Sequence, residues 1–187
     1  FIIEGIPYDV VGGVNFYARK EIKDILAYLK TIDNGQDDLQ VRRIINIPKR
    51  GIGATTVNRV QAYAEENEMS FYDALRLGRS ASKLEPFVTL IQSFRAKLEY
   101  YTLKQLLDDI VESTGYVKEL QESDDEDAED RIANINELIS KVVAFEAAHE
   151  DATLSSFLQE VALVADIDGV ESDNNKVLLM TLHSAKG

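Results

Sequence analysis

Apolar residues recur along most of this chain with the spacing of amphipathic helices. The first clear set has members three or four positions apart, and it comprises Ile22, Ile25, Leu26, Leu29 and Ile32. This spacing places the side chains on one face of a helix. Asn34 and Gly35 follow directly, and glycine readily adopts the backbone angles that end a helix. The pattern predicts a helix from about Glu21 to Ile32 that packs on a neighbour.

Helices are predicted through most of the remaining sequence as well. Two helices, over residues 38–46 and 55–66, flank a segment whose proline and glycines would break a single longer helix. Thr102 and Gln105 form a capping-box pattern between two later helices. The apolar stripes of the later helices are Phe87, Leu90, Ile91, Phe94, Leu98 and Tyr101; Leu103, Leu106, Leu107, Ile110 and Val111; Ile132, Ile135, Leu138, Ile139, Val142 and Val143; and positions within 154–164.

The two ends of the chain have a different pattern. Ile6 to Val11 has the composition of a short β-strand, and Lys176 to Leu182 that of a buried strand after a linker over 166–175. Because a strand needs partners, we expect both ends to belong to one sheet from which the helical part is an insertion. The predicted fold class is mainly α: a helical domain at 37–171, flanked by short α/β pieces at 1–36 and 172–187.

Composition limits the class of protein. With 187 residues and 45% apolar content the chain can bury a real core. It has no cysteine, no charged-then-apolar leader and no apolar run near the ~20 residues of a bilayer span, which predicts a cytoplasmic setting without a membrane. The chain begins at Phe1 instead of a methionine, which predicts a segment cut from a longer protein.

The charge is unevenly distributed. A net charge of −13 argues against a protein that coats nucleic acid, because phosphate binding depends on clustered Lys and Arg. Glu122 to Asp130 holds seven acids without the spacing of a calcium loop, and we expect a solvated, mobile loop there. Arg42 to Arg59 holds five bases and no acid. Any DNA contact is therefore expected on the second stretch.

The segment Ile47 to Thr56, with the sequence IPKRGIGATT, lies between two predicted helices and resembles a helix-hairpin-helix. Glycines let a backbone approach a phosphate, the unpaired amides that open the second helix donate to its oxygens, and Lys49 and Arg50 add charge. A grip of this kind reads no base sequence. A plain interhelical turn with solvated bases stays open as the alternative, because short motifs discriminate weakly.

Two further segments carry candidate residues. A glycine turn at 12–13 precedes Phe16, Tyr17 and Arg19, and such aromatics can stack on bases; the residues alone favour the alternative that both aromatics are core. A polar run follows the last strand, and loops at strand ends of α/β sheets often face ligands. Its candidates are Thr181, His183, Ser184 and Lys186. They form no metal set and no Ser/His/Asp arrangement.

Taken in this order, the three segments resemble the superfamily 1 helicases of the UvrD, PcrA and Rep type. Residues 6–24 look like the block after motif IV, residues 47–53 look like the Gly-Ile-Gly element, and residues 179–187 look like the start of motif V. The resemblance spans the chain, although 70–173 matches mainly in helical character. It implies a helical 2B-type insertion that swivels on the second RecA-like motor domain, 2A, so that 1–36 and 172–187 would belong to 2A.

The resemblance also assigns roles. Duplex DNA would be held at Lys49, Arg50, Gly51, Ile52, Gly53, Thr55 and Thr56. Coupling of the nucleotide state to single-stranded DNA would involve Phe16, Arg19, Thr181, His183, Ser184 and Lys186. The implied parent is a bacterial ATP-dependent 3′-to-5′ DNA helicase of repair or replication that uses ATP and Mg²⁺. Its implied partners are DNA, the motor domains of the same chain, and repair or transcription proteins.

The sequence departs from that family in what it lacks. Walker A, Walker B, the arginine-bearing part of motif IV and motif VI are absent, so we expect no ATP hydrolysis and no bound cofactor in the chain alone. The main alternative is a helical module that recognises another protein through its acidic surface. A self-sufficient enzyme has little support, because no catalytic constellation can be assembled from these residues.

Overall fold

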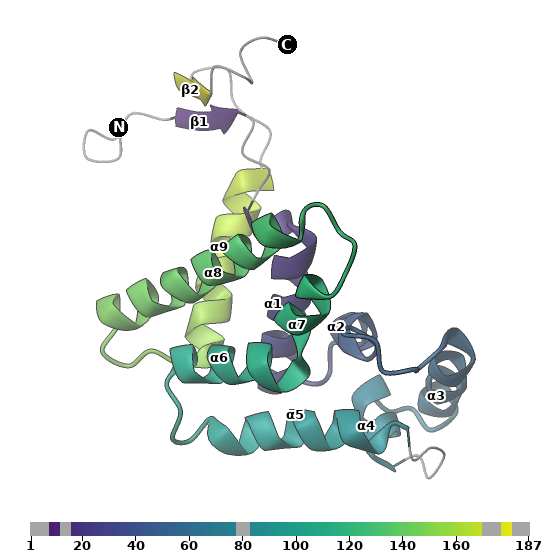
Figure 1. The fold of residues 1–187 in the computed structure, drawn as a ribbon. Helices are drawn as coiled ribbons and strands as arrows, with labels where there is room; N and C mark the ends of the chain where they lie inside the picture. Colours follow the sequence, from purple (N-terminus) through teal and green to yellow (C-terminus); the bar gives the residue numbers. More distant parts are fainter. Residues whose placement is uncertain (1–7, 12–15, 78–82, 170–176, 181–187) are drawn as a thin grey trace.

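The computed structural model describes residues 8–11, 16–77, 83–169 and 177–180, and it is mainly helical (Figure 1). The expected fold class is therefore confirmed. The helices are α1 (Lys20–Asp33), α2 (Asp38–Ile44), α3 (Ala54–Glu66), α4 (Phe71–Leu77), α5 (Glu85–Lys97), α6 (Leu103–Thr114), α7 (Tyr116–Gln121), α8 (Ala128–Ala148) and α9 (Leu154–Gly169). A 3₁₀ turn, η1 (Phe16–Ala18), precedes α1, and the strands are β1 (Tyr8–Val11) and β2 (Val177–Met180).

Helix α1 lies at the centre of the helical body. It packs against α2, α5, α6, α8 and α9 (Figure 1), and its predicted apolar face is buried. Ile22 and Ile25 are fully inaccessible, as are Ala27 and Tyr28. Burial on so many sides means that α1 is a core helix of the body, which the sequence had predicted only as a helix packed on one neighbour.

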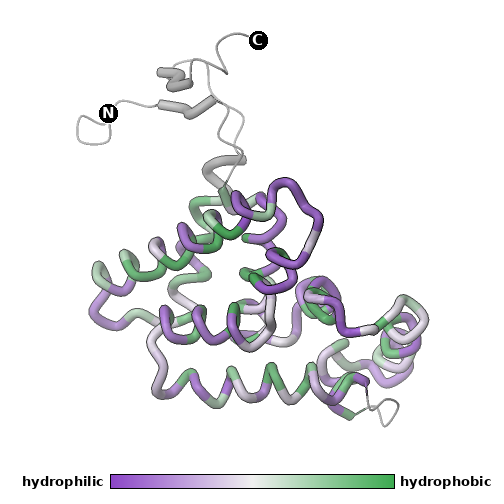
Figure 2. Tube along the Cα trace, viewed as in Figure 1, coloured by the Kyte–Doolittle hydropathy of each residue, from purple (hydrophilic) through white to green (hydrophobic). Residues whose placement is uncertain are grey.

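Most residues of the other predicted apolar stripes also face inward, and Figure 2 shows apolar positions along one side of several helices. Leu98 and Val143 were expected in these stripes but are exposed. Phe87, Ile91 and Phe94 of α5 are buried, as are Leu138 and Val142 of α8. The helices expected over these stripes are thus present, but α5 ends at Lys97, before Leu98 and Tyr101. The short helices α4 and α7 were not predicted. None of the helices in the described part of the chain is long and apolar enough to cross a bilayer.

Several boundaries differ from the sequence prediction. α2 ends at Ile44, two residues early, because Asn46 turns its side chain back to the loop that follows. α8 begins at Ala128, so the acidic run ends within its first turn, where acids suit the helix dipole. Asp125 of that run also pairs with Arg131 at 2.9 Å. α9 extends to Gly169, so the expected linker from 166 is helical in its first part.

Helix α6 has the capping box that its sequence predicts. The Thr102 hydroxyl accepts from the amide of Gln105, and the Gln105 side chain accepts from the amide of Thr102. At its other end Gly115 has a φ of 72°, a left-handed conformation that favours glycine. That residue turns the chain directly into α7.

A buried carboxylate joins three helices. Asp24 of α1 is fully inaccessible and accepts from Arg43 Nε of α2 at 2.7 Å and from the Tyr116 hydroxyl of α7 at 2.8 Å. Such a charge is tolerated inside a protein only when it is paired and hydrogen-bonded. Burial raises the pKa of Tyr116, and the neighbouring Asp24 carboxylate raises it further, so the Tyr116 hydroxyl stays protonated.

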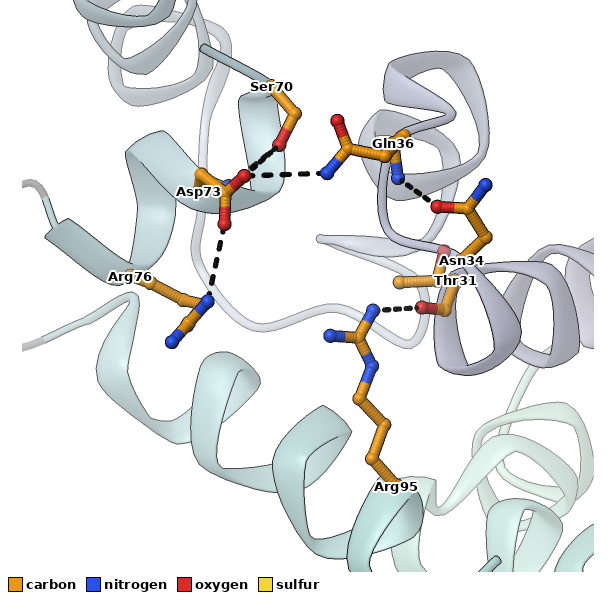
Figure 3. A network of polar contacts seen from close by, with 7 residues as sticks. All are labelled: Thr31, Asn34, Gln36, Ser70, Asp73, Arg76 and Arg95. Carbon is orange, nitrogen blue, oxygen red and sulfur yellow. Dashed lines mark hydrogen bonds and ion pairs between the residues drawn. The ribbon is translucent and has the colours of Figure 1, made fainter.

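The turn between α1 and α2 is held by polar contacts from α4 and α5 (Figure 3). Arg95 donates from Nε to the Ile32 carbonyl at 3.0 Å and from Nη2 to the Thr31 carbonyl at 2.7 Å, which satisfies acceptors at the end of α1. On the other side Gln36 donates to Asp73, which also accepts from the Ser70 hydroxyl. The turn is therefore held in place by contacts with α5 on one side and with α4 on the other.

The strands β1 and β2 pair in parallel, with Tyr8 opposite Val177 and Val11 opposite Met180. Figure 1 draws them together beyond one end of the helical body. Two segments far apart in sequence are thus hydrogen-bonded neighbours, with the helical body between them along the chain. The division into motor-domain pieces at 1–36 and 172–187 and an insertion at 37–171 stays a prediction.

Candidate nucleic-acid interface

The loop between α2 and α3, residues 45–53, is called the hairpin loop here. Its tip is open to solvent: Lys49, Gly51 and Gly53 are exposed, and the exposed surface continues into Ala54 and Thr55. Ile52, by contrast, is only 2% exposed and belongs to the hydrophobic core. Ile52 thus anchors the tip of a loop in which Gly51 and Gly53, on either side of it, are exposed.

Five amides of the hairpin loop are satisfied within the fold: those of Ile45 and Ile47 donate to main-chain carbonyls, and three others donate to side chains. Asn46 Oδ1 accepts from the amides of Arg50 at 2.8 Å and Ile52 at 3.1 Å. Glu119 of α7 accepts from the amide of Lys49 at 2.8 Å. These hydrogen bonds to the side chains of Asn46 and Glu119 fix the path of the loop backbone. Glu119 could not be found from local sequence, because it lies 70 positions from Lys49. Asn46 could have been, because an asparagine at a helix end often bonds nearby backbone.

The remaining amides of this region have a different environment. Within the described residues, no acceptor pairs with the amides of Gly51, Gly53, Ala54 or Thr55. Gly53 is the N-cap of α3, in extended conformation and without a capping side chain. The first amides of a helix lack partners within the helix and carry the positive end of its dipole. An anion can therefore be bound here by backbone donors.

The fold places the basic residues between Arg42 and Arg59 in different environments. Lys49, Arg42 and Arg59 are exposed, and none of the three forms an ion pair with the described part of the chain. Arg43 instead pairs with buried Asp24 at 2.7 Å. Arg50 is half-buried, and its guanidinium donates to main-chain oxygens of the last residue of α2 and of the loop. Of the two hairpin cations expected at phosphate, only Lys49 has its charge directed to solvent.

Phe16 and Arg19 lie beside α8. The Arg19 guanidinium is 5.4 Å from the Phe16 ring centroid, and the ammonium of Lys141 is 4.9 Å from it. Arg19 also donates to Asn134 Oδ1, while Asn134 Nδ2 donates to Glu21 at 2.7 Å. Phe16 is half-buried and packs against the core. The fold thus brings Phe16 and Arg19 together and ties them to α8, with Asn134 as a partner that the sequence did not suggest.

The candidates at the end of the chain, Thr181, His183, Ser184 and Lys186, lie outside the described residues. Over the part of the chain that is described, no group of His, Cys, Asp or Glu is arranged to hold a metal ion. The sequence also lacks a Gly-x-x-x-x-Gly-Lys-Ser/Thr phosphate loop. The described residues therefore do not fit a Mg²⁺–nucleotide site.

Comparison with known proteins identifies the family. The family model described as the UvrD-like helicase C-terminal domain matches residues 1–187. The chain belongs to this family. Among similar proteins is an ATP-dependent DNA helicase PcrA of Bacillus subtilis (strain 168), 38% identical over 98% of this chain and 26% of that protein. Another of the same name, from Staphylococcus aureus (strain Mu50), is 40% identical over 100% of this chain and 27% of that protein.

The family membership covers the whole chain, whereas the chain spans only about a quarter of the length of the curated relatives it matches. A third relative, an ATP-dependent DNA helicase PcrA of Staphylococcus epidermidis, is 39% identical over 100% of this chain and 27% of that protein. The predicted resemblance to UvrD/PcrA-type helicases is confirmed by these matches. The roles of single residues in DNA binding stay predictions.

Proposed function

We propose that this chain is the part of an ATP-dependent 3′-to-5′ DNA helicase that grips duplex DNA and regulates unwinding. The parent would act in DNA repair or replication in the bacterial cytoplasm. Two things support the proposal: membership of the UvrD-like family, and relatives named as ATP-dependent DNA helicases. The names of the relatives support the use of ATP by the parent. The direction of unwinding, the use of Mg²⁺, and contacts with repair or transcription proteins come from the family resemblance.

The observation that carries the duplex grip is the hairpin loop. Gly51, Gly53 and Thr55 are exposed residues whose amides have no acceptor among the described residues. They lie close in sequence to the exposed Lys49, on a loop anchored by buried Ile52. Backbone amides at a helix start, joined by one cation, bind phosphate oxygens without reading bases. The hydroxyls of Thr55 and Thr56 are further donors at the same helix start. A sequence-independent grip on the DNA backbone is the function that this arrangement supports best.

The helical body would be the 2B-type insertion of that helicase, and the strand pair would belong to motor domain 2A. The packing of α1 inside the body favours a boundary before Lys20 instead of the expected one at residue 36. Phe16 and Arg19 would then lie where the two domains join. Their contacts with α8 offer a physical link between a candidate single-strand site and the insertion.

The test compares duplex binding by the chain and by Lys49→Gln over a series of salt concentrations, using fluorescence anisotropy and a duplex with a 3′ tail. Each cation at a phosphate contributes about −0.9 to the slope of log K against log salt. We expect Lys49→Gln to weaken binding on every sequence and to make the slope shallower by about that amount. Lys104→Gln, which removes an exposed charge on α6, is the matched control and should leave the slope unchanged.

The alternative function has its own outcome in this experiment. Glu122 to Asp130 forms an acidic surface that suits a basic protein partner. If neither the chain nor Lys49→Gln binds duplex at any salt concentration, the duplex grip is wrong and the protein-recognition module is favoured. The chain alone should also hydrolyse no ATP, and measured turnover would contradict its role as an accessory part.

A further inference from the structure

Arg50 lies in the hairpin loop, and its guanidinium points into the loop. Its Nη1 is within hydrogen-bonding distance of four main-chain oxygens, and their distances are 3.0 Å for Ile44, 3.4 Å for Ile45, 3.1 Å for Ile47 and 3.2 Å for Pro48. These oxygens belong to the end of α2 and to the loop that follows. One guanidinium group thus contacts carbonyls at the end of a helix and in a sharp turn. The Ile44 and Ile47 carbonyls also accept from the Ile47 amide and the Tyr28 hydroxyl, respectively.

The other side of the guanidinium connects the hairpin loop to two core helices. Nη2 donates to the Tyr28 hydroxyl of α1, and that hydroxyl donates to the Ile47 carbonyl. The Arg50 guanidinium carbon is 5.5 Å from the Phe87 ring centroid on α5 and 5.9 Å from that of Tyr28, both fully buried residues. Burial raises the pKa of Tyr28 to about 12, so the hydroxyl keeps the proton that it donates.

These contacts are incompatible with a phosphate role for the same group. To reach a DNA phosphate, the guanidinium would have to leave the four carbonyls and the Tyr28 hydroxyl. Part-buried acceptors such as the Pro48 carbonyl would then lose their hydrogen bond, which costs free energy. With the guanidinium in place, the carbonyls of residues 44–48 are held inward. The backbone that presents the open amides of Gly51 and Gly53 then follows a fixed path.

We propose that Arg50 is a positioning residue: it holds the hairpin loop in its phosphate-binding conformation and does not itself contact DNA. This inference rests on the proposed duplex grip. A loop that is already ordered loses less conformational entropy on binding than a mobile one. The contribution of Arg50 to affinity is therefore independent of salt, unlike that of Lys49.

The test uses Arg50→Lys, Arg50→Gln and Tyr28→Phe, with Lys49→Gln for comparison. Lysine keeps the charge but lacks the planar fork of five donors, so it cannot replace the guanidinium at the loop. Tyr28→Phe removes one link while every charge and the ring stay. Two quantities are measured: duplex affinity across salt concentrations, and hydrogen exchange without DNA at the amides of Lys49 and Ile52, which are bonded to Glu119 and Asn46.

We expect Arg50→Lys and Arg50→Gln each to weaken duplex binding about tenfold at every salt concentration, with the slope of the unchanged chain. Tyr28→Phe should act in the same direction to a smaller extent. The amides of Lys49 and Ile52 should exchange faster in all three variants. Lys49→Gln should show the opposite pattern, with a shallower slope and unchanged exchange at Ile52.

The proposal is overturned if Arg50→Lys binds like the unchanged chain while Arg50→Gln makes the slope shallower by about 0.9, because that is the behaviour of a phosphate ligand. Unchanged hydrogen exchange in the Arg50 variants and in Tyr28→Phe also overturns it. If the unchanged chain binds no duplex, the proposed function fails, and the exchange result decides separately whether Arg50 holds the loop.

Discussion

At the scale of single residues, Gly35 shows how closely the turn after α1 is packed. A Cβ at this position would meet Arg95 Nη2 at 2.7 Å and Tyr72 Cδ1 at 2.9 Å. Arg95 cannot withdraw freely, because it donates to the Thr31 carbonyl (Figure 3) and to the Ile32 carbonyl, and its guanidinium lies over the Tyr72 ring at 4.6 Å. Glycine is required here for space, since its φ lies outside the left-handed region.

We expect Gly35→Ala to lower the free energy of unfolding by about 1–3 kcal/mol, the usual effect of inserting a methyl group into a filled site. Gly53→Ala is the matched control, because a Cβ there meets nothing within 4 Å and the backbone is extended. Urea unfolding of both variants measures the difference. Equal stability of the two variants would contradict the packing described at Gly35.

The buried tyrosines predict a dependence on alkaline pH. Burial raises the pKa of Tyr28 to about 12 in the folded chain, from an ordinary value of 10.0. A pKa that is raised in the folded state stabilises the fold below the unfolded pKa, and this contribution is lost as the pH rises through the folded value. Stability should therefore fall between pH 10 and about 12, by on the order of 2 kcal/mol for Tyr28. Tyr116 acts in the same direction.

Urea unfolding measured below and above the ordinary tyrosine pKa tests this dependence. Tyr28→Phe should show a smaller loss of stability over the same pH range, because phenylalanine has no proton to lose. Absorbance titration of the folded chain should show late-ionising tyrosines that titrate normally in urea. An identical pH profile in the variant would exclude Tyr28 as the cause.

At the scale of elements, Asp24 is the polar contact that joins α1, α2 and α7. Its removal leaves the Tyr116 hydroxyl and Arg43 Nε without their acceptor inside the fold. We expect Asp24→Ala to cost about 2–4 kcal/mol in the free energy of unfolding, as for other broken buried pairs. The figure is moderate because the Arg43 side chain is one-third exposed and can recover water.

Asp108→Ala is the matched control for Asp24→Ala. Asp108 also pairs with a cation, Lys104, but both side chains are nearly half exposed and lie on one helix. Exposed pairs of this kind contribute about 0.5 kcal/mol or less. Denaturant unfolding should therefore separate the two variants clearly, and similar losses would show that Asp24 is not the joint between the helices.

The long amphipathic elements could be predicted from the sequence because their apolar residues repeat with the helical period. α4 and α7 could not, because each is under two full turns and offers too few repeats. The exposed glycines and Lys49 of the hairpin loop were also found from local composition. The inward turn of Arg50 could not be, since it depends on Tyr28 and Phe87, which come from other helices.

At the scale of the whole molecule, acidic and basic regions lie close together in space. A cavity of about 340 Å³ is lined by Lys49 from the hairpin loop, Glu119 from α7, and Asp125 from the acidic run. Negative charge beside a phosphate-binding loop weakens DNA binding through like-charge repulsion, most strongly at low salt. Part of the acidic excess behind the net charge of −13 thus lies beside the proposed DNA-binding loop, where its effect on DNA binding is strongest.

We expect the double variant Asp124→Asn/Glu126→Gln to bind duplex more tightly at low salt, with stability changed by no more than about 0.5 kcal/mol, because both side chains are exposed. Glu99→Gln/Glu112→Gln removes the same charge from other exposed positions and is the matched control. Anisotropy titrations compare the two. An equal gain in both would mean that only the total charge matters.

The parallel pairing of β1 with β2 has a topological consequence. Parallel neighbours cannot be joined by a tight turn and need a crossover, for which one helix ordinarily suffices. In this protein the crossover comprises every described helix from α1 to α9. The register of β1 with β2 therefore depends on where the two ends of the inserted segment lie, and not directly on its length. An insertion whose two ends lie side by side at this edge can connect the strands without changing their pairing.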